Sequence, residues 1–204
     1  KLKKMNKIYN PSRSEWDAVL KRPTKTVDDI EDTVNQIFAE VKAKGDAAVA
    51  KYTDMFDGIK LENTLATSEE IAAAETEISE ELKSAILLAK KNIEKFHAAQ
   101  KTDKVEVETT SGVKCWQEKR PIQKIGLYIP GGSAPLFSTI LMLAVPAAIA
   151  GCKEIVLCTP PNKEGKVHPA ILYTANLCGV TKINKIGGIQ AIAALTFGTE
   201  TVPK

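Results

Sequence analysis

Two glycine pairs, each standing just before an apolar stretch of helical character, are the residues of this sequence best suited to hold a ligand. They are Gly131-Gly132 and Gly187-Gly188. Glycine lets the backbone come close to a ligand, and a helix N-terminus presents free N–H groups with a positive potential. A phosphate-bearing ligand is one interpretation, and ordinary turn chemistry is the other, because glycine is common in such turns. The sequence contains neither the GxGxxG dinucleotide fingerprint nor the Walker lysine motif.

Tyr128 and Gln190 lie beside these glycine pairs and are the candidate ligand-binding side chains. The Tyr128 ring could stack on a base or a nicotinamide, and its hydroxyl could bond a phosphate or a ribose; alternatively the ring fills the end of a strand. Gln190 opens the helix that follows Gly188, so its amide could bind a ligand amide, or it could be a surface residue of the first turn. The residues alone leave both pairs of alternatives open.

Histidines and cysteines show no catalytic or metal-binding spacing. The two histidines, His97 and His168, stand far apart, and a zinc site needs three or four converging ligands. The four cysteines form no CxxC pair, and we expect them to be buried, reduced thiols. They are Cys115, Cys152, Cys158 and Cys178. We therefore expect no catalytic residue and no metal ligand within these 204 residues.

The elements that position Tyr128 and Gln190 alternate between strand and helix. We expect strands at 125–129, 154–158 and 180–186, and helices at 137–150, 169–177 and 190–197. At these spacings the pattern predicts a parallel, doubly wound α/β unit of Rossmann-like βαβαβα order. Ligands bind such sheets beyond the carboxyl ends of the strands, so the sequence places both candidate residues at one edge.

The first hundred residues are predicted to be helical. Thr67 and Glu70 form a capping-box pattern, and Thr26 and Ser79 are expected to open further helices. Period-two alternation on both sides of Ser111-Gly112 then predicts a β-hairpin near 105–118. We therefore expect two domains: 1–122, the helical part of an incomplete first domain with its hairpin, and 123–204, the Rossmann-like domain.

Composition and charge exclude some classes of function. The net charge is +3, from 28 basic and 25 acidic residues, without the concentrated basic stripe that nucleic-acid binding requires. The longest apolar run, 141–151, contains Pro146 and is too short to span a bilayer. No signal peptide is recognisable. We therefore expect a cytoplasmic protein with no nucleic-acid or membrane partner.

Several segments resemble histidinol dehydrogenases. They are RPIQKIGLYIPGGSAPLFSTILMLAVPAAIAGCKEIVLCTPP at 120–161, KIGGIQAIAALTFGTETVPK at 185–204, NIEKFHAAQK at 92–101 and KAKGDAAVAKYTDMFDG at 42–58. The resemblance extends from about Arg22 to Lys204. It implies an enzyme that oxidises L-histidinol to L-histidine through histidinal, in two hydride transfers to NAD⁺, as the last step of histidine biosynthesis.

The resemblance also implies cofactors, partners and site residues. Such enzymes are zinc-dependent homodimers with intertwined subunits and an aldehyde-dehydrogenase-like architecture. Tyr128 and Gln190 match the family's NAD-contacting tyrosine and glutamine, which makes 123–204 the NAD-binding domain. The zinc ligands and the Glu-His pair used as general acid and base are expected beyond Lys204. The 204 residues would then be an N-terminal portion that is inactive alone.

An incomplete first domain predicts an exposed apolar helix face and self-association. The candidate faces are Ile30, Val34 and Ile37, or Ile86, Ile93 and Phe96.

Three other classes of function compete with the dehydrogenase. A catalytically silent nucleotide-binding module is the main alternative. An aldehyde dehydrogenase relative is disfavoured because no cysteine lies in a polar, glycine-flanked loop. The two glycine pairs disfavour a purely structural protein.

Overall fold

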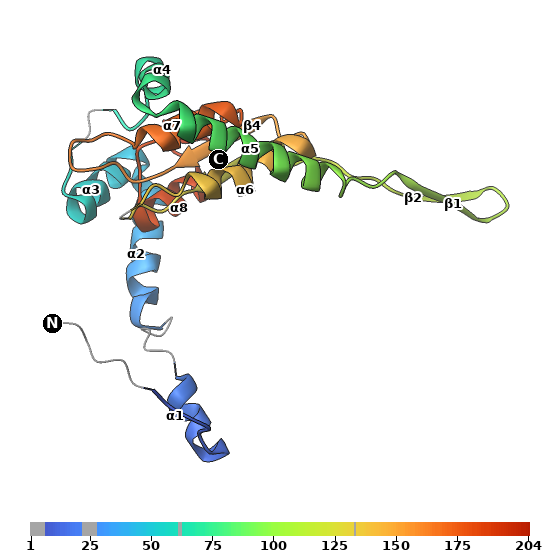
Figure 1. The fold of residues 1–204 in the computed structure, drawn as a ribbon, viewed down its shortest axis with the longest axis horizontal. Coiled ribbons are helices and arrows are strands. Elements are labelled where there is room, and N and C mark those ends of the chain that lie inside the picture. The colour runs from blue at the N-terminus through green and yellow to red at the C-terminus, as the bar shows by residue number, and fades with distance from the viewer. Residues whose placement is uncertain (1–6, 22–27, 61–62, 133) are drawn as a thin grey trace. The chain divides into compact units, whose positions relative to one another are not determined.

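The computed structural model describes residues 7–21, 28–60, 63–132 and 134–204. Thr26, the expected start of the first long helix, lies outside them. Packing divides the chain into two units, 1–34 and 35–204. The first contains a 3-10 turn, η1 (Arg13–Glu15), the short helix α1 (Trp16–Leu20) and the beginning of α2 (Asp28–Lys44) (Figure 1). Neither η1 nor α1 buries a residue, so the packed core belongs to the second unit.

A three-stranded parallel sheet is the centre of the second unit. Its strands are β3 (Lys124–Tyr128), β4 (Glu154–Cys158) and β5 (Lys182–Asn184), in the order β3-β4-β5. The register places Tyr128 opposite Cys158, and Cys158 opposite Asn184. The predicted parallel unit is thus confirmed, although β5 is shorter than the expected 180–186.

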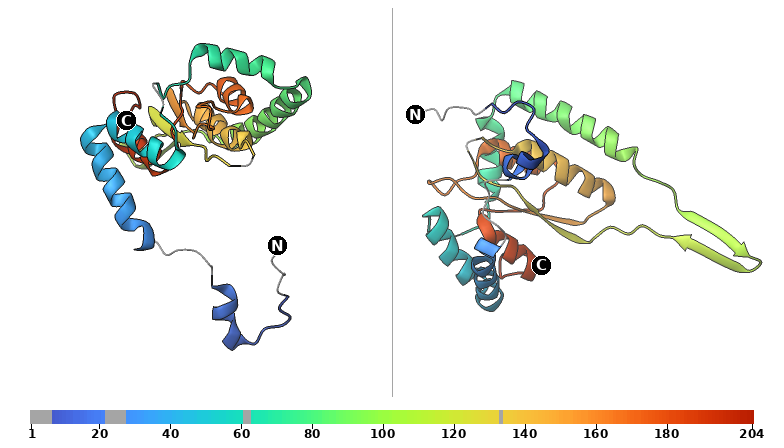
Figure 2. Two further views of the ribbon diagram at one scale, coloured as in Figure 1. Left: turned by 90° about the vertical axis from the view of Figure 1, so that its left-hand side faces the viewer. Right: turned by 90° about the horizontal axis from the view of Figure 1, so that it is seen from below.

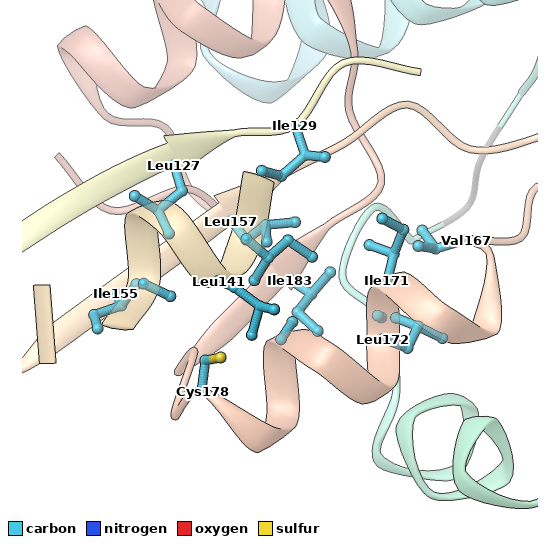
Figure 3. Packing of buried hydrophobic residues seen from close by; sticks show 14 of the residues in the cluster. Leu127, Ile129, Leu141, Ile155, Leu157, Val167, Ile171, Leu172, Cys178 and Ile183 are labelled. Carbon is cyan, nitrogen blue, oxygen red and sulfur yellow. The ribbon is translucent and has the colours of Figure 1, made fainter. Parts of the chain in front are cut away.

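Helices cover both faces of this sheet. The elements α6 (Phe137–Ala150), α7 (Pro169–Leu177), α4 (Ser68–Glu77) and α5 (Glu80–Ala98) enclose one core, while α3 (Asp46–Asp57), α8 (Gly188–Phe197) and the later part of α2 enclose another. The first core contains Leu127 and Leu157 of the sheet together with Leu141 of α6 and Ile171 of α7 (Figure 3). Tyr128 packs against the second core, since neighbouring residues of a strand face opposite ways.

Local sequence signals set several helix ends where they were expected. The backbone N–H of Glu70 donates to the Thr67 hydroxyl, and the Thr67 N–H donates to the Glu70 carboxylate, which completes the predicted capping box. The backbone N–H of Leu82 likewise donates to the Ser79 hydroxyl at the start of α5. The helix α6 ends at Gly151, whose φ of +91° favours glycine. These ends follow from hydrogen bonds between near neighbours in sequence.

The early helices pack on the parallel sheet, so the predicted exposed faces are only partly present. Ile37 of α2 and Ile86 of α5 are buried, with 1% and 0% of their surface exposed, because each lies in one of the two cores. Ile30 and Phe96 are exposed, at 47% and 65%. The predicted exposed apolar face is therefore wrong for Ile37 and Ile86 and confirmed for Ile30 and Phe96. The proposed division at 122/123 stays a prediction.

The hairpin prediction is confirmed. β1 (Val105–Thr110) pairs antiparallel with β2 (Val113–Gln117), and Gly112 in the turn has a φ of +82°. Every residue of both strands is exposed. Figure 2 shows the hairpin extending beyond the end of α5. Among the described helices, none is both long enough and apolar enough to cross a membrane.

Candidate functional site

The predicted site residues meet where the parallel strands end. The backbone N–H of Gly188, the first residue of α8, donates to the Tyr128 hydroxyl over 3.0 Å. Tyr128 ends β3, so this bond joins two segments that lie 60 residues apart in the sequence. It also supplies an acceptor that Gly187 lacks, because this N-cap residue has no side chain to cap the helix. The structure thus places Tyr128 at the N-terminus of α8, beside Gln190.

Gln190 is a buried residue whose polar atoms have no partner. None of its surface is exposed, and neither Oε1 nor Nε2 has a hydrogen bond within the described part of the chain. A Cβ built on Gly188, which has a φ of +64°, would lie 2.8 Å from Gln190 Oε1, so the side chain folds back against the turn. The interpretation of Gln190 as a surface residue is therefore wrong. A buried amide without partners indicates a missing hydrogen-bonding group.

Packing explains one glycine in each pair. A Cβ on Gly131 would lie 2.6 Å from Pro160 Cγ, and a Cβ on Gly187 would lie 2.5 Å from Pro160 Cβ. Pro160 follows β4, so the three strand ends meet around its ring. Gly132 has open space where its Cβ would stand. The ordinary packing explanation therefore accounts for Gly131 and Gly187, and the positive φ and the Gln190 side chain account for Gly188. Of these four glycines, Gly132 is the one that leaves open space for a ligand to approach.

Asn184 is a buried polar residue that the sequence reasoning did not single out. It lies in one row across the sheet with Cys158 and Tyr128. It is fully buried, and neither Oδ1 nor Nδ2 has a partner in the described residues. Burial raises the pKa of the neighbouring Cys158 thiol to about 12, so that sulfur is no nucleophile. A lone asparagine in an apolar strand was the signal that could have revealed this row.

The two histidines make local hydrogen bonds, and the remaining cysteines differ in how far they are buried. His168 caps α7, since its Nδ1 accepts from the Ala170 N–H at 3.1 Å. His97 Nδ1 pairs with the Gln100 side chain at 2.7 Å. Within the described ranges, no three His, Cys, Asp or Glu side chains are grouped so that they could hold a metal ion. Cys115 is exposed on the hairpin, so the expectation that all four thiols are buried is wrong.

Comparison with known proteins decides the family. Residues 20–204 match the family model described as histidinol dehydrogenase. The chain belongs to the histidinol dehydrogenase family. The predicted resemblance is thereby confirmed over nearly the whole sequence.

Individual relatives agree with this assignment. The chain is 57% identical over 200 residues to a histidinol dehydrogenase of Bacteroides fragilis, covering 98% of this chain and 47% of that protein. It is 56% identical over 172 residues to the enzyme of Escherichia coli K12, covering 84% of this chain and 39% of that protein. A crystal structure of histidinol dehydrogenase from Elizabethkingia anophelis matches with a TM-score of 0.88 and 54% identity, over 96% of this chain and 45% of the other. The chain therefore spans about half the length of the curated relatives it matches.

Proposed function

We propose that this chain forms the cofactor-binding part of an NAD-dependent oxidoreductase that oxidises L-histidinol to L-histidine. Bound NAD⁺ would accept the hydride in each of two steps. The observation that carries the proposal is the buried, unpartnered amide of Gln190, which lies next to the bond between Tyr128 and Gly188. Membership of the histidinol dehydrogenase family supports the choice of a dehydrogenase cofactor as the partner of this amide.

The residues present fit a nicotinamide cofactor. The free Oε1 and Nε2 of Gln190 can accept from and donate to a carboxamide, the group that nicotinamide carries. The half-buried Tyr128 ring lies at the strand end, where a planar ring can stack on it. Gln190 is covered at present, so the turn at Gly187-Gly188 must open slightly for this contact. Glycine at these positions permits such a backbone movement.

The residues described here do not fit zinc, and we derive no step through a metal. We propose that the zinc ligands and the acid–base pair belong to the rest of the full-length polypeptide, as does most of the surface that binds L-histidinol. We also propose a cytoplasmic homodimer and an aldehyde-dehydrogenase-like architecture for the whole enzyme. The length of the relatives supports this division, since this chain covers 39% to 47% of them.

An activity assay with matched tyrosine variants tests the proposal. L-histidinol, NAD⁺ and Zn²⁺ are added to the full-length protein and to residues 1–204, and the absorbance of NADH is followed. We expect turnover only by the full-length protein. Tyr128→Phe in that protein should raise the KM for NAD⁺ about fivefold, because the hydrogen bonding of the Tyr128 hydroxyl, worth about 1 kcal/mol, is lost. Tyr173→Phe, on α7 at the other face of the sheet, is the control and should leave KM unchanged.

Two results would overturn the assignment. Turnover by residues 1–204 alone would show that the catalytic groups lie within this chain. Failure of the full-length protein to reduce NAD⁺ with L-histidinol, while it still binds NAD⁺, would favour the alternative of a catalytically silent nucleotide-binding module.

A further inference from the structure

A cavity of about 470 Å³ lies at the carboxyl ends of β3 and β4, on the side of the sheet covered by α6 and α7. The turn after β3 forms one wall, and the loop between β4 and α7 forms the other. Its polar lining side chains are Glu77, Thr159, Asn162, Lys166 and His168. Neither Tyr128 nor Gln190 lines this cavity. Its polar groups therefore have no role in the contacts described above.

Thr159 presents an unused hydroxyl to the cavity. Only 4% of its surface is exposed, and that surface belongs to the cavity lining. Its backbone N–H donates to the Asn184 carbonyl at 3.0 Å, which continues the sheet ladder by one residue. Its hydroxyl has no hydrogen-bond partner among the described residues. Alternation along β4 turns this side chain to the same face as Leu157, toward α6 and α7. A hydroxyl that borders the cavity in this way can hydrogen-bond to an occupant.

Local hydrogen bonds fix the backbone at Lys166 and the ring of His168 in the loop before α7. Asn162 Oδ1 accepts from the backbone N–H groups of Glu164 and Lys166, at 3.1 and 2.8 Å, which makes a tight turn that positions Lys166. His168 uses Nδ1 to accept from the Ala170 N–H, so a neutral ring carries its proton on Nε2. The Nε2–H is then the donor that His168, a lining residue, has left for an occupant of the cavity. The loop thus offers an ammonium group and an imidazole N–H from one wall.

The charge balance of the cavity favours an anion. Lys166 forms no ion pair with a described residue, and Glu77 is the one carboxylate in the lining. The opposite wall contains the start of α6, whose N-cap residue, Leu136, provides no side-chain cap. The positive end of that helix therefore remains open toward the cavity. Lys166 offsets the single carboxylate of the lining, although it also borders an adjacent pocket lined by Glu69 and Glu70, and the helix end adds a positive potential.

We propose that this cavity binds a phosphoryl group at the adenylate end of the dinucleotide, with Lys166, Thr159 and His168 as the side chains that hold it. The inference rests on the proposed function. Pro160 lines the cavity and also packs against the glycine turn that opens α8. One ligand can therefore pass over Pro160 with its nicotinamide end at Gln190 and its phosphate in the cavity.

Calorimetric titration of the full-length protein with ADP-ribose and with adenosine tests this site. Lys166→Ala should weaken ADP-ribose binding about tenfold, because a charge-assisted bond to a phosphate is lost, and Thr159→Val should weaken it by a smaller factor. Adenosine has no phosphate, so its binding should not change. Lys163→Ala removes a lysine from the same loop but not from the cavity lining, and it should leave both affinities unchanged.

The outcomes separate this site from the proposed function. If Lys166→Ala and Thr159→Val change ADP-ribose binding no more than Lys163→Ala does, while NAD⁺ still supports turnover, the cavity proposal is wrong and the function stands. If Lys166→Ala weakens adenosine as much as ADP-ribose, the cavity does not read a phosphate, and the proposal is also wrong. If the unmodified full-length protein neither bound NAD⁺ nor turned over L-histidinol, the proposed function itself would be wrong.

Discussion

Gln190→Met is the substitution that most directly separates a ligand-binding amide from a structural one. Methionine is similar in length and flexible enough to fill the same space, but it carries no strong hydrogen-bonding group. Gln190 buries both amide atoms without partners. Such burial costs about 1–3 kcal/mol, so the variant should be more stable than the original protein in the absence of cofactor.

The magnitude can be measured as a shift in thermal unfolding. We expect the midpoint of unfolding of the cofactor-free protein to rise by about 2–4 °C for each kcal/mol gained. Binding of NAD⁺ should weaken by about tenfold or more, because the carboxamide loses both its donor and its acceptor. The additional stabilisation that NAD⁺ gives should shrink accordingly.

Thr174→Val is the matched control. Thr174 on α7 is also fully buried with an unpartnered hydroxyl, but it does not line the candidate site. Its removal should raise stability by about 1 kcal/mol and leave NAD⁺ binding unchanged. Our reasoning would be refuted if Gln190→Met lowered the stability of the cofactor-free protein, or if it raised stability and bound NAD⁺ as tightly as the original protein does.

Two further predictions concern titration and thiol reactivity. The ion pair with Lys51 is the main cause that lowers the pKa of Glu40 to about 2 in the folded chain, from 4.5. The stabilisation from this ion pair is therefore present above pH 4.5 and lost as the pH falls toward 2. The acid unfolding of Glu40→Gln, followed by circular dichroism, should show a flatter pH dependence across that window. An unchanged profile would contradict this prediction. A thiol reagent near pH 8 should modify the native protein fastest at the exposed Cys115. Cys158 and Cys178 should react only after unfolding, because burial raises their thiol pKa values to about 12 and 11. Early modification of either buried thiol, seen by peptide mapping, would be inconsistent with this prediction.

The sequence by itself determined much of the secondary structure and the edge at which the site lies. The helix α6 and the strand β4 have the bounds that their apolar runs and closing residues predicted, and the Thr67–Glu70 capping box is formed. These features depend on interactions between residues close in the chain, which a pattern of residue types records directly. Parallel strand order then placed Tyr128 and Gln190 at the same edge of the sheet.

Only the tertiary structure decided how that edge is built. Gln190 and Asn184 are buried without partners because helices and strands from distant parts of the chain close over them, and no local pattern records that closure. Pro160 decides the role of Gly131 and Gly187, since three strand ends must pack before its ring can meet either glycine. The packing of the early helices on the sheet likewise buried apolar faces that their own sequence left without a partner.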